Sequence, residues 1–202
     1  MPLPARFPAP AVVAALLGIV AALMPTAARA DEAPAFEVID DLGAGVEVRD
    51  YAPMLLASIV VDSADFGQAS SLGFPPLADY ISGDNNRRER IGMTSPVTQG
   101  GGPGRWVVGF VMPARYTAES LPRPRDPRIR ITSVPRRSVA AIRFRGRFNT
   151  FRYAESLRVL EIQLGRSDWI ADGEPQAAQY DAPWVPGPLR RNEVLLPVRR
   201  RE

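Results

Sequence analysis

The stretch FEVIDDLGAGVEVRDY, residues 36–51, sets the fold class together with the segment that follows it. Apolar and polar residues alternate with a period of two on both sides of Gly43-Ala44-Gly45. This pattern predicts two antiparallel strands joined by a tight turn. The apolar run Met54–Val61 predicts a third strand, buried on both faces.

The next segment, Phe66–Ser82, changes to a helical period, because its apolar residues recur every three or four positions. These residues are Phe66, Ala69, Gly73, Leu77, Tyr80 and Ile81. The pair Pro75-Pro76 lies inside the pattern, so we expect the helix to kink or restart there.

A glycine-rich stretch separates the next two extended segments. Ile91–Val97 is predicted to be a short strand or extended segment, and Arg105–Met112 a strand. Between them, Gln99–Gly104 is predicted to be a flexible hairpin loop. It is not a phosphate-binding loop, because no Gly-Lys-Ser/Thr follows it.

The second half of the chain repeats this layout. Its predicted elements are strands at Arg128–Ile131 and Val139–Phe144, a helix from Phe151 to Leu164, short strands at Trp169-Ile170 and Gln176–Tyr180, and a last strand at Glu193–Val198. Asn149 or Thr150 would cap the helix, and Gly165 would end it. Two strand–strand–helix–strand–strand units predict a duplicated α+β motif, with two helices on an antiparallel sheet or distorted barrel.

Residues 1–30 read as a secretory signal peptide. Arg6 precedes the apolar run Ala11–Met24, and Ala28-Arg29-Ala30 is a small-x-small cleavage site. We therefore expect an exported, periplasmic protein without a stable membrane span after cleavage. The alternative is a membrane anchor formed by an uncleaved signal, since the apolar count lengthens if it starts at Pro8. The remaining chain divides into a linker at 31–35, a single domain at 36–198 and a basic tail at 199–202.

Composition removes most of the common catalytic groups. The 202 residues include no His, no Cys and no Lys, so all 25 basic residues are arginines. This excludes Ser-His-Asp and Cys-His nucleophiles, zinc sites of the usual kind, Schiff-base lysines and disulfides. The adjacent pair Asp40-Asp41 is better explained by turn chemistry than by catalysis, because neighbours on a strand point to opposite faces. The composition favours a binding protein over an enzyme, with no metal site.

The charges are unevenly distributed along the chain. Residues 31–122 carry 13 acids and 6 arginines, whereas residues 123–202 carry 9 acids and 17 arginines. The basic half could attract carboxylates or phosphates, or simply form a solvated face. The alternation of Arg143, Arg145 and Arg147 has the same two interpretations. Nucleic acid is not expected, because no base-stacking aromatics are interleaved with these arginines and the net charge after cleavage is only +1.

Two segments have a composition that suggests a role beyond supporting the fold. The first is Leu77–Asn86 with the following Ile91–Val97, and the second is Tyr180–Pro186 with the following Leu189–Val194. Loops that hold Trp and Tyr between prolines, beside arginines, are typical of the mouth of a ligand site. The alternative is a hydrophobic loop that caps the end of a barrel.

These segments give the sequence a resemblance to the SOUL haem-binding protein family. The resemblance is carried by Val46–Tyr51, Leu77–Gly83 with Asn85, Ile91–Val97, Phe110–Pro113, Tyr180–Trp184 and Arg190–Val194. It spans about Phe36 to Val198. It implies a distorted antiparallel β-barrel flanked by two helices and built by duplication.

The resemblance also implies a haem or other tetrapyrrole, bound non-covalently in an apolar groove between the first helix and the Tyr180–Trp184 loop. The corresponding residues here are Leu72, Phe74, Leu77 and Tyr80 on the helix, Tyr180, Pro183 and Trp184 on the loop, and Arg190 and Arg191 for the ligand's propionates. The partner would be a small, hydrophobic, anionic molecule. For the helix residues, packing in the core is the alternative.

The absence of histidine departs from family members thought to ligate iron through it. The remaining axial candidates are Met54, Met93, Met112, Tyr80 and Tyr180. We therefore expect a weakly ligated or unligated iron. Two other functions stay open: a small-molecule module like the bacterial effector-binding domains, which this fold also resembles, and a protein-interaction scaffold without a tetrapyrrole.

Overall fold

The computed structural model describes residues 32–182 and 184–201. The strands in this part of the chain are β1 (Phe36–Gly43), β2 (Val46–Tyr51), β3 (Met54–Val61), β4 (Val97–Gly102), β5 (Arg105–Val111), β6 (Arg130–Val134), β7 (Arg137–Arg145), β8 (Trp169–Ala171), β9 (Gln176–Gln179) and β10 (Arg191–Arg200). The helices are α1 (Phe66–Ser82), α2 (Thr150–Leu164) and the short 3-10 turn η2 (Gly187–Leu189). The predicted signal peptide, residues 1–30, lies outside the described residues.

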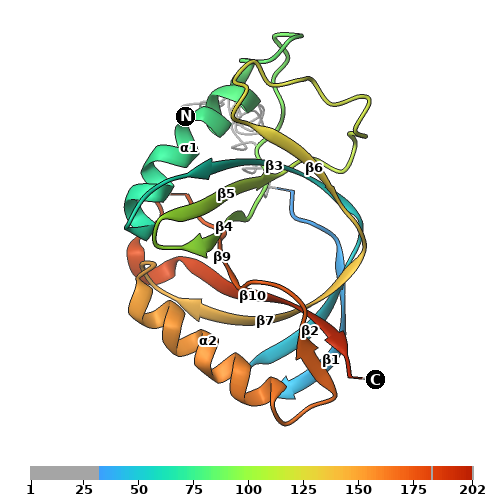
Figure 1. Ribbon diagram of the computed structural model, residues 1–202, viewed down its shortest axis with the longest axis vertical. Coiled ribbons are helices and arrows are strands. Elements are labelled where there is room, and N and C mark those ends of the chain that lie inside the picture. The colour runs from blue at the N-terminus through green and yellow to red at the C-terminus, as the bar shows by residue number, and fades with distance from the viewer. Residues whose placement is uncertain (1–31, 183, 202) are drawn as a thin grey trace, which may run out of the picture. The chain divides into compact units, whose positions relative to one another are not determined.

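A single curled antiparallel sheet forms the body of the fold (Figure 1). Its strand order is β1-β2-β7-β10-β9-β4-β5-β3-β6, and β8 pairs with β10 outside this path. Helix α1 packs on β5 and β3, and α2 packs mainly on β7. The expected α+β barrel with two flanking helices is confirmed. No helix within the described residues is long and apolar enough to cross a bilayer.

The sheet consists of two similar halves, which meet where β4 pairs with β9. On one side lie β5, β3 and β6, and on the other lie β10, β7 and β2. The unit β3-α1-β4-β5 therefore corresponds to β7-α2-β9-β10. The strand that precedes each unit is exchanged, because β2 pairs with β7 and β6 pairs with β3.

Helix α1 begins at Asp65, whose carboxylate accepts a hydrogen bond from the Gln68 amide at 2.9 Å. The six apolar residues predicted from the helical period are all buried. The restart expected as one possibility at Pro75-Pro76 is wrong, because α1 runs unbroken to Ser82. The carbonyls that these prolines leave without a helical partner belong to Ser71 and Leu72, which are exposed, so water can satisfy them.

The glycine-rich stretch is also more regular than expected. Residues 97–102 form β4, and the turn is confined to Pro103 and Gly104. Gly101 has a φ of +96°, and a Cβ there would collide with the Arg105 carbonyl oxygen. Glycine lets this strand bend sharply without losing its pairing. The segment 91–96, in contrast, contains only an isolated bridge between Thr94 and Glu32.

Two clusters of buried side chains lie beneath the helices, and a third lies inside the curl of the sheet. The first packs α1 on β3 and β5, and the second packs α2 on β7 and β10. The third contains Tyr51, Val139, Ala141, Ala178 and Leu195, with Met54 and Tyr180 against it. The inside of the curl is therefore a separate environment from the two helix interfaces.

The approach of α1 to the sheet depends on Gly73. A Cβ at this position would lie 2.6 Å from Val108 Cγ2, in the middle of β5. We predict that Gly73→Ala lowers the free energy of unfolding by about 1–3 kcal/mol, because α1 must move away from the sheet. Gly165→Ala is the control: its φ of −61° and contacts of 3.5 Å accept a methyl group, so stability should stay the same or rise by about 0.4–1 kcal/mol. Urea unfolding of both variants measures the difference, and equal stabilities would contradict the packing argument.

Candidate functional site

An ion pair between Arg49 and Glu193 occupies the inside of the barrel. The guanidinium donates to both carboxylate oxygens, at 2.8 and 3.1 Å, and each residue is 2% exposed. Tyr180 donates its hydroxyl to Glu193 at 2.6 Å, and Arg143 donates to the same carboxylate at 3.2 Å. The Glu193 carboxylate on β10 therefore binds side chains from β2, from β7 and from the connection between β9 and β10.

These contacts shift several pKa values. Burial alone would raise the pKa of Glu193, but hydrogen bonds from Arg49 and Tyr180 outweigh it and hold this pKa below its ordinary value. Burial and the adjacent Glu193 raise the pKa of Tyr180. At neutral pH the network therefore contains an ionised carboxylate, a protonated tyrosine and two arginines.

Arg137 is a further arginine facing the barrel interior, at the start of β7. Its Nε atom is buried and finds no hydrogen-bond partner among the described residues. Burial lowers the pKa of Arg137. Beside it lies a small space of about 40 Å³, whose walls include Tyr51, Met54 and Leu195.

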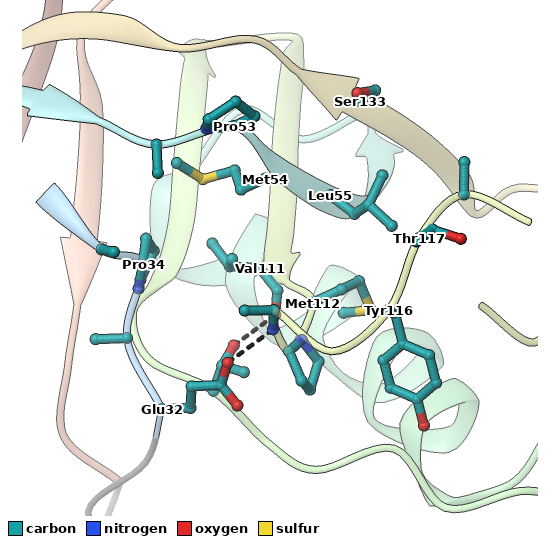
Figure 2. A pocket seen from close by; sticks show the side chains of 17 residues that line it. Glu32, Pro34, Pro53, Met54, Leu55, Val111, Met112, Tyr116, Thr117 and Ser133 are labelled. Atoms are coloured by element: carbon teal, nitrogen blue, oxygen red, sulfur yellow. Dashed lines mark hydrogen bonds between the residues drawn. The ribbon is translucent and has the colours of Figure 1, made fainter. Parts of the chain in front are cut away.

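A larger cavity of about 550 Å³ opens next to this space (Figure 2). Its walls come from residues 32–35, the turn between β2 and β3, and residues 111–118 after β5. They are mostly Ala, Pro, Leu, Val and Met. Glu32 lies on one side, where its carboxylate accepts a hydrogen bond from the Ala114 amide at 2.7 Å, and Pro53 and Met54 lie on the other.

The second predicted loop is held to the barrel by its polar residues. Arg191 forms an ion pair with Asp181 at 3.6 Å, and its guanidinium lies 5.5 Å from the centre of the Tyr180 ring. Arg190 donates to the Val185 carbonyl at 2.9 Å. Trp184 is 84% exposed. Pro183 lies outside the described residues.

The predicted helix residues divide into two groups. Leu77 and Tyr80 are buried, and the Tyr80 hydroxyl donates to the Pro122 carbonyl at 2.7 Å. Leu72 is 53% exposed, and Phe74 is partly exposed with its ring against Phe110. Leu72 and Phe74 can therefore contact a ligand on the outside of α1, whereas Leu77 and Tyr80 support the helix from beneath.

Met93 belongs with the supporting residues, because it is partly buried against the core cluster under α1. No described contact joins Leu72, Phe74 or Met93 to the second loop. The first turn of α1 instead contacts the connection between β7 and α2, where Phe66 stacks on Phe148 at 4.1 Å.

Next to that stacked pair is a pocket lined by arginines. Arg145, Arg147 and Arg152 surround about 430 Å³ together with Gly187 and Pro188 of the second loop. Arg152 is held in place by donating to the Arg145 carbonyl at 2.7 Å. Of the three alternating arginines, Arg143 turns to Glu193, whereas Arg145 at the end of β7 and Arg147 just after it line this pocket.

Sequence reasoning missed Arg152, Arg137 and the larger cavity. Arg152 lies on a predicted helix, and nothing in the local pattern places it beside Arg147. The cavity walls come from three segments that the strand exchange brings together. In the described part of the chain, no group of three or more Asp or Glu residues could hold a metal ion.

Comparison with known proteins places these features in context. A family model described as SOUL heme-binding protein matches residues 31–197. The chain is 30% identical to heme-binding protein 2 of Homo sapiens over 84% of its length and 87% of the relative's. It is 29% identical to heme-binding protein 1 of Xenopus laevis over 75% of its length and 83% of the relative's.

Solved structures share the fold at low sequence identity. The crystallised EcmrR C-terminal domain superposes with a TM-score of 0.60 and 14% identity, over 77% of this chain and 97% of that domain. A hydrolase from Listeria innocua superposes with a TM-score of 0.54 and 12% identity, over 76% of this chain and 91% of the other. At these identities the likeness concerns the fold alone.

Removing one partner of the buried ion pair should be costly. We predict that Glu193→Gln lowers the free energy of unfolding by up to about 3–5 kcal/mol, because Arg49 stays charged and buried with only the partly exposed Glu47 as a counter-charge. The double variant Arg49→Met/Glu193→Leu should recover most of this loss, since apolar pairs of similar volume often replace buried ion pairs without cost. Urea unfolding tests this, and a double variant less stable than Glu193→Gln would contradict it.

The same carboxylate should make stability depend on acid. Because the folded pKa of Glu193 is lowered, its contribution is complete above the ordinary carboxyl pKa of about 4.3 and is lost as the pH falls through the folded value. We predict that the stability difference between the native protein and Glu193→Gln is constant from pH 7 to 5 and shrinks below about pH 4. Urea unfolding across this range measures it. A difference that does not change with pH would contradict the assignment.

Proposed function

Because this chain belongs to the SOUL heme-binding protein family, we propose that it binds haem or a related tetrapyrrole as a non-catalytic binding protein. The proposed site is the outer surface around the arginine-lined pocket, beside the second loop, residues 180–191. The ligand would bind there without an axial histidine, because the chain has none.

The arginine-lined pocket carries this proposal. Arg145, Arg147 and Arg152 lie beside Gly187 and Pro188, and the same loop exposes the apolar side chains of Trp184 and Leu189. Tetrapyrroles combine a flat apolar ring with carboxylate side chains, and guanidinium groups bind carboxylates in bidentate fashion. Arginines beside exposed apolar side chains match both parts of such a ligand.

The exposed residues of α1 would add to the apolar surface. Leu72 and Phe74 lie on the outer face of the helix, beyond the first turn that contacts Phe148. Arg191, whose side chain is 52% exposed, is a second source of positive charge on the loop. Arg190 is held by the Val185 carbonyl and would position the loop.

The available side chains do not supply an iron ligand at this surface. The hydroxyls of Tyr80 and Tyr180 already donate to Pro122 and Glu193. Met112 is buried in the core, and Met93 packs against it. We therefore propose that apolar contact and arginine–carboxylate pairing hold the ligand, with the iron unligated by the protein.

A module for cationic ligands is disfavoured at the proposed outer site. Glu193, the carboxylate that binds the Tyr180 hydroxyl of the second loop, is already paired with Arg49. The arginines on the outer surface would also repel a cation.

Binding would take place outside the cytoplasm if residues 1–30 act as a signal peptide, and at the membrane if that segment stays attached.

The proposal predicts similar affinities for haem and for the metal-free porphyrin. Titration of the protein with hemin and with protoporphyrin IX, followed by absorbance and fluorescence, should give saturable binding. The two dissociation constants should agree within about tenfold, or about 1.4 kcal/mol. A much tighter haem complex with a low-spin spectrum would contradict an unligated iron.

Amino-acid substitutions test where on the protein the tetrapyrrole binds. Arg145→Ala/Arg147→Ala and Leu189→Asp should each weaken porphyrin binding about tenfold or more, since they remove charge-assisted bonds or apolar contact. Leu72→Asp tests whether α1 takes part. The matched controls are Arg105→Ala and Val38→Asp, exposed residues on β5 and β1. Equal losses in the controls, or no loss in the loop variants, would overturn the placement.

A further inference from the structure

One arginine of the barrel interior lacks a carboxylate partner. Arg49 pairs with Glu193 and Glu47, and Arg143 reaches Glu193 from a half-exposed position. Arg137 has no carboxylate within ion-pair distance among residues 32–182 and 184–201. The buried Nε of Arg137 also lacks a hydrogen-bond partner in this range. A buried, unsatisfied cationic donor of this kind calls for an anion or ordered water.

The space beside Arg137 lies next to the larger cavity. Pro34, Met54 and Val111 line both spaces, so the two share a wall. Met54 is the most adaptable of the three, because its unbranched side chain rotates easily. Figure 2 shows Met54 at the edge of the larger cavity, with Pro34 and Val111 nearby.

The sizes and linings of the two spaces define a ligand shape. The small space, about 40 Å³, accommodates a headgroup little larger than a water molecule, whose liquid volume is about 30 Å³. The larger one, about 550 Å³, lies within the range of roughly 300–1,000 Å³ that small-molecule sites occupy. Its alanine, proline and methionine walls suit a hydrocarbon chain.

Charged residues determine how the ligand would be oriented in the two spaces. Glu32 lies at the wall of the large cavity away from Met54, so a carboxylate there would be repelled. Arg137 lines the smaller space, which shares Met54 with the larger cavity, and offers the unsatisfied donor. We propose that the two spaces together bind a linear aliphatic monocarboxylate, a fatty acid, with its carboxylate on Arg137 and its chain in the larger cavity.

This site is separate from the proposed tetrapyrrole surface. The residues that line the two spaces include none of the arginines of the outer pocket and none of residues 180–191. The chemistry also differs, because the headgroup space is too small for a porphyrin ring. Failure of either proposal therefore leaves the other standing.

Isothermal titration with dodecanoate, below its micelle-forming concentration, tests the proposal. Binding should be saturable with one molecule per chain, and dodecanol, which has the same chain without the charge, should bind about tenfold or more weakly. Arg137→Met should weaken dodecanoate binding by about tenfold to a hundredfold. Arg136→Met is the matched control, because this neighbouring arginine is exposed and paired with Asp50. The affinity of the Arg136→Met variant for dodecanoate should equal that of the native protein.

A second set of measurements tests whether dodecanoate binds in the cavity and not elsewhere on the protein. Ala118→Trp should block the cavity and abolish binding, while the loop variant Leu189→Asp should leave dodecanoate binding intact. Hemin should not displace dodecanoate. The proposal is overturned if dodecanol binds as well as dodecanoate, if Arg136→Met and Arg137→Met lose affinity equally, or if hemin competes. The comparison of dodecanoate with dodecanol uses the native protein, so it decides the matter even if a variant does not fold.

Discussion

The paired charges of Arg49 and Glu193 constrain how the two halves of the sheet meet. These residues are 144 positions apart in sequence, on β2 and β10, with β7 between them. A buried ion pair is tolerated only when its geometry is good and its remaining hydrogen bonds are satisfied. A slip of one residue in either β2–β7 or β7–β10 would turn one charge out of the barrel and leave the other buried alone. The pair therefore penalises every register except the observed one.

That constraint acts at the point where the duplicated units exchange strands. β2 precedes the first unit in sequence but pairs with β7 of the second, and β6 does the reverse with β3. Neither unit completes its own sheet, so neither has a closed core without the other. The exchange also carries residues 32–35 and the turn at 52–53 across to the end of β5, where they help to enclose the larger cavity. The cavity thus follows from the exchange and has no counterpart in a single unit.

The sequence predicted the elements better than their assembly. The helical period placed every buried residue of α1, and Asn149 and Gly165 marked the ends of α2, because these signals are local. A restart of the helix at Pro75-Pro76 was wrongly predicted, since the missing hydrogen bonds fall on the exposed face of α1. The loop motif drew attention to Tyr180, whose hydroxyl binds Glu193 inside the barrel. Its orientation depends on the distant residues Arg49 and Glu193, which no local pattern could reveal.

The absence of lysine gains physical meaning from Arg137. A lysine buried in the same place could lose its proton and become a neutral amine, as buried lysines often do. Arginine retains its proton under practically all conditions, even where burial lowers its pKa. The guanidinium next to Met54 therefore stays charged throughout the pH range in which a carboxylate ligand is ionised. An arginine at this position makes the protein's contribution to anion binding independent of pH, so only the ionisation of the ligand sets a lower pH limit.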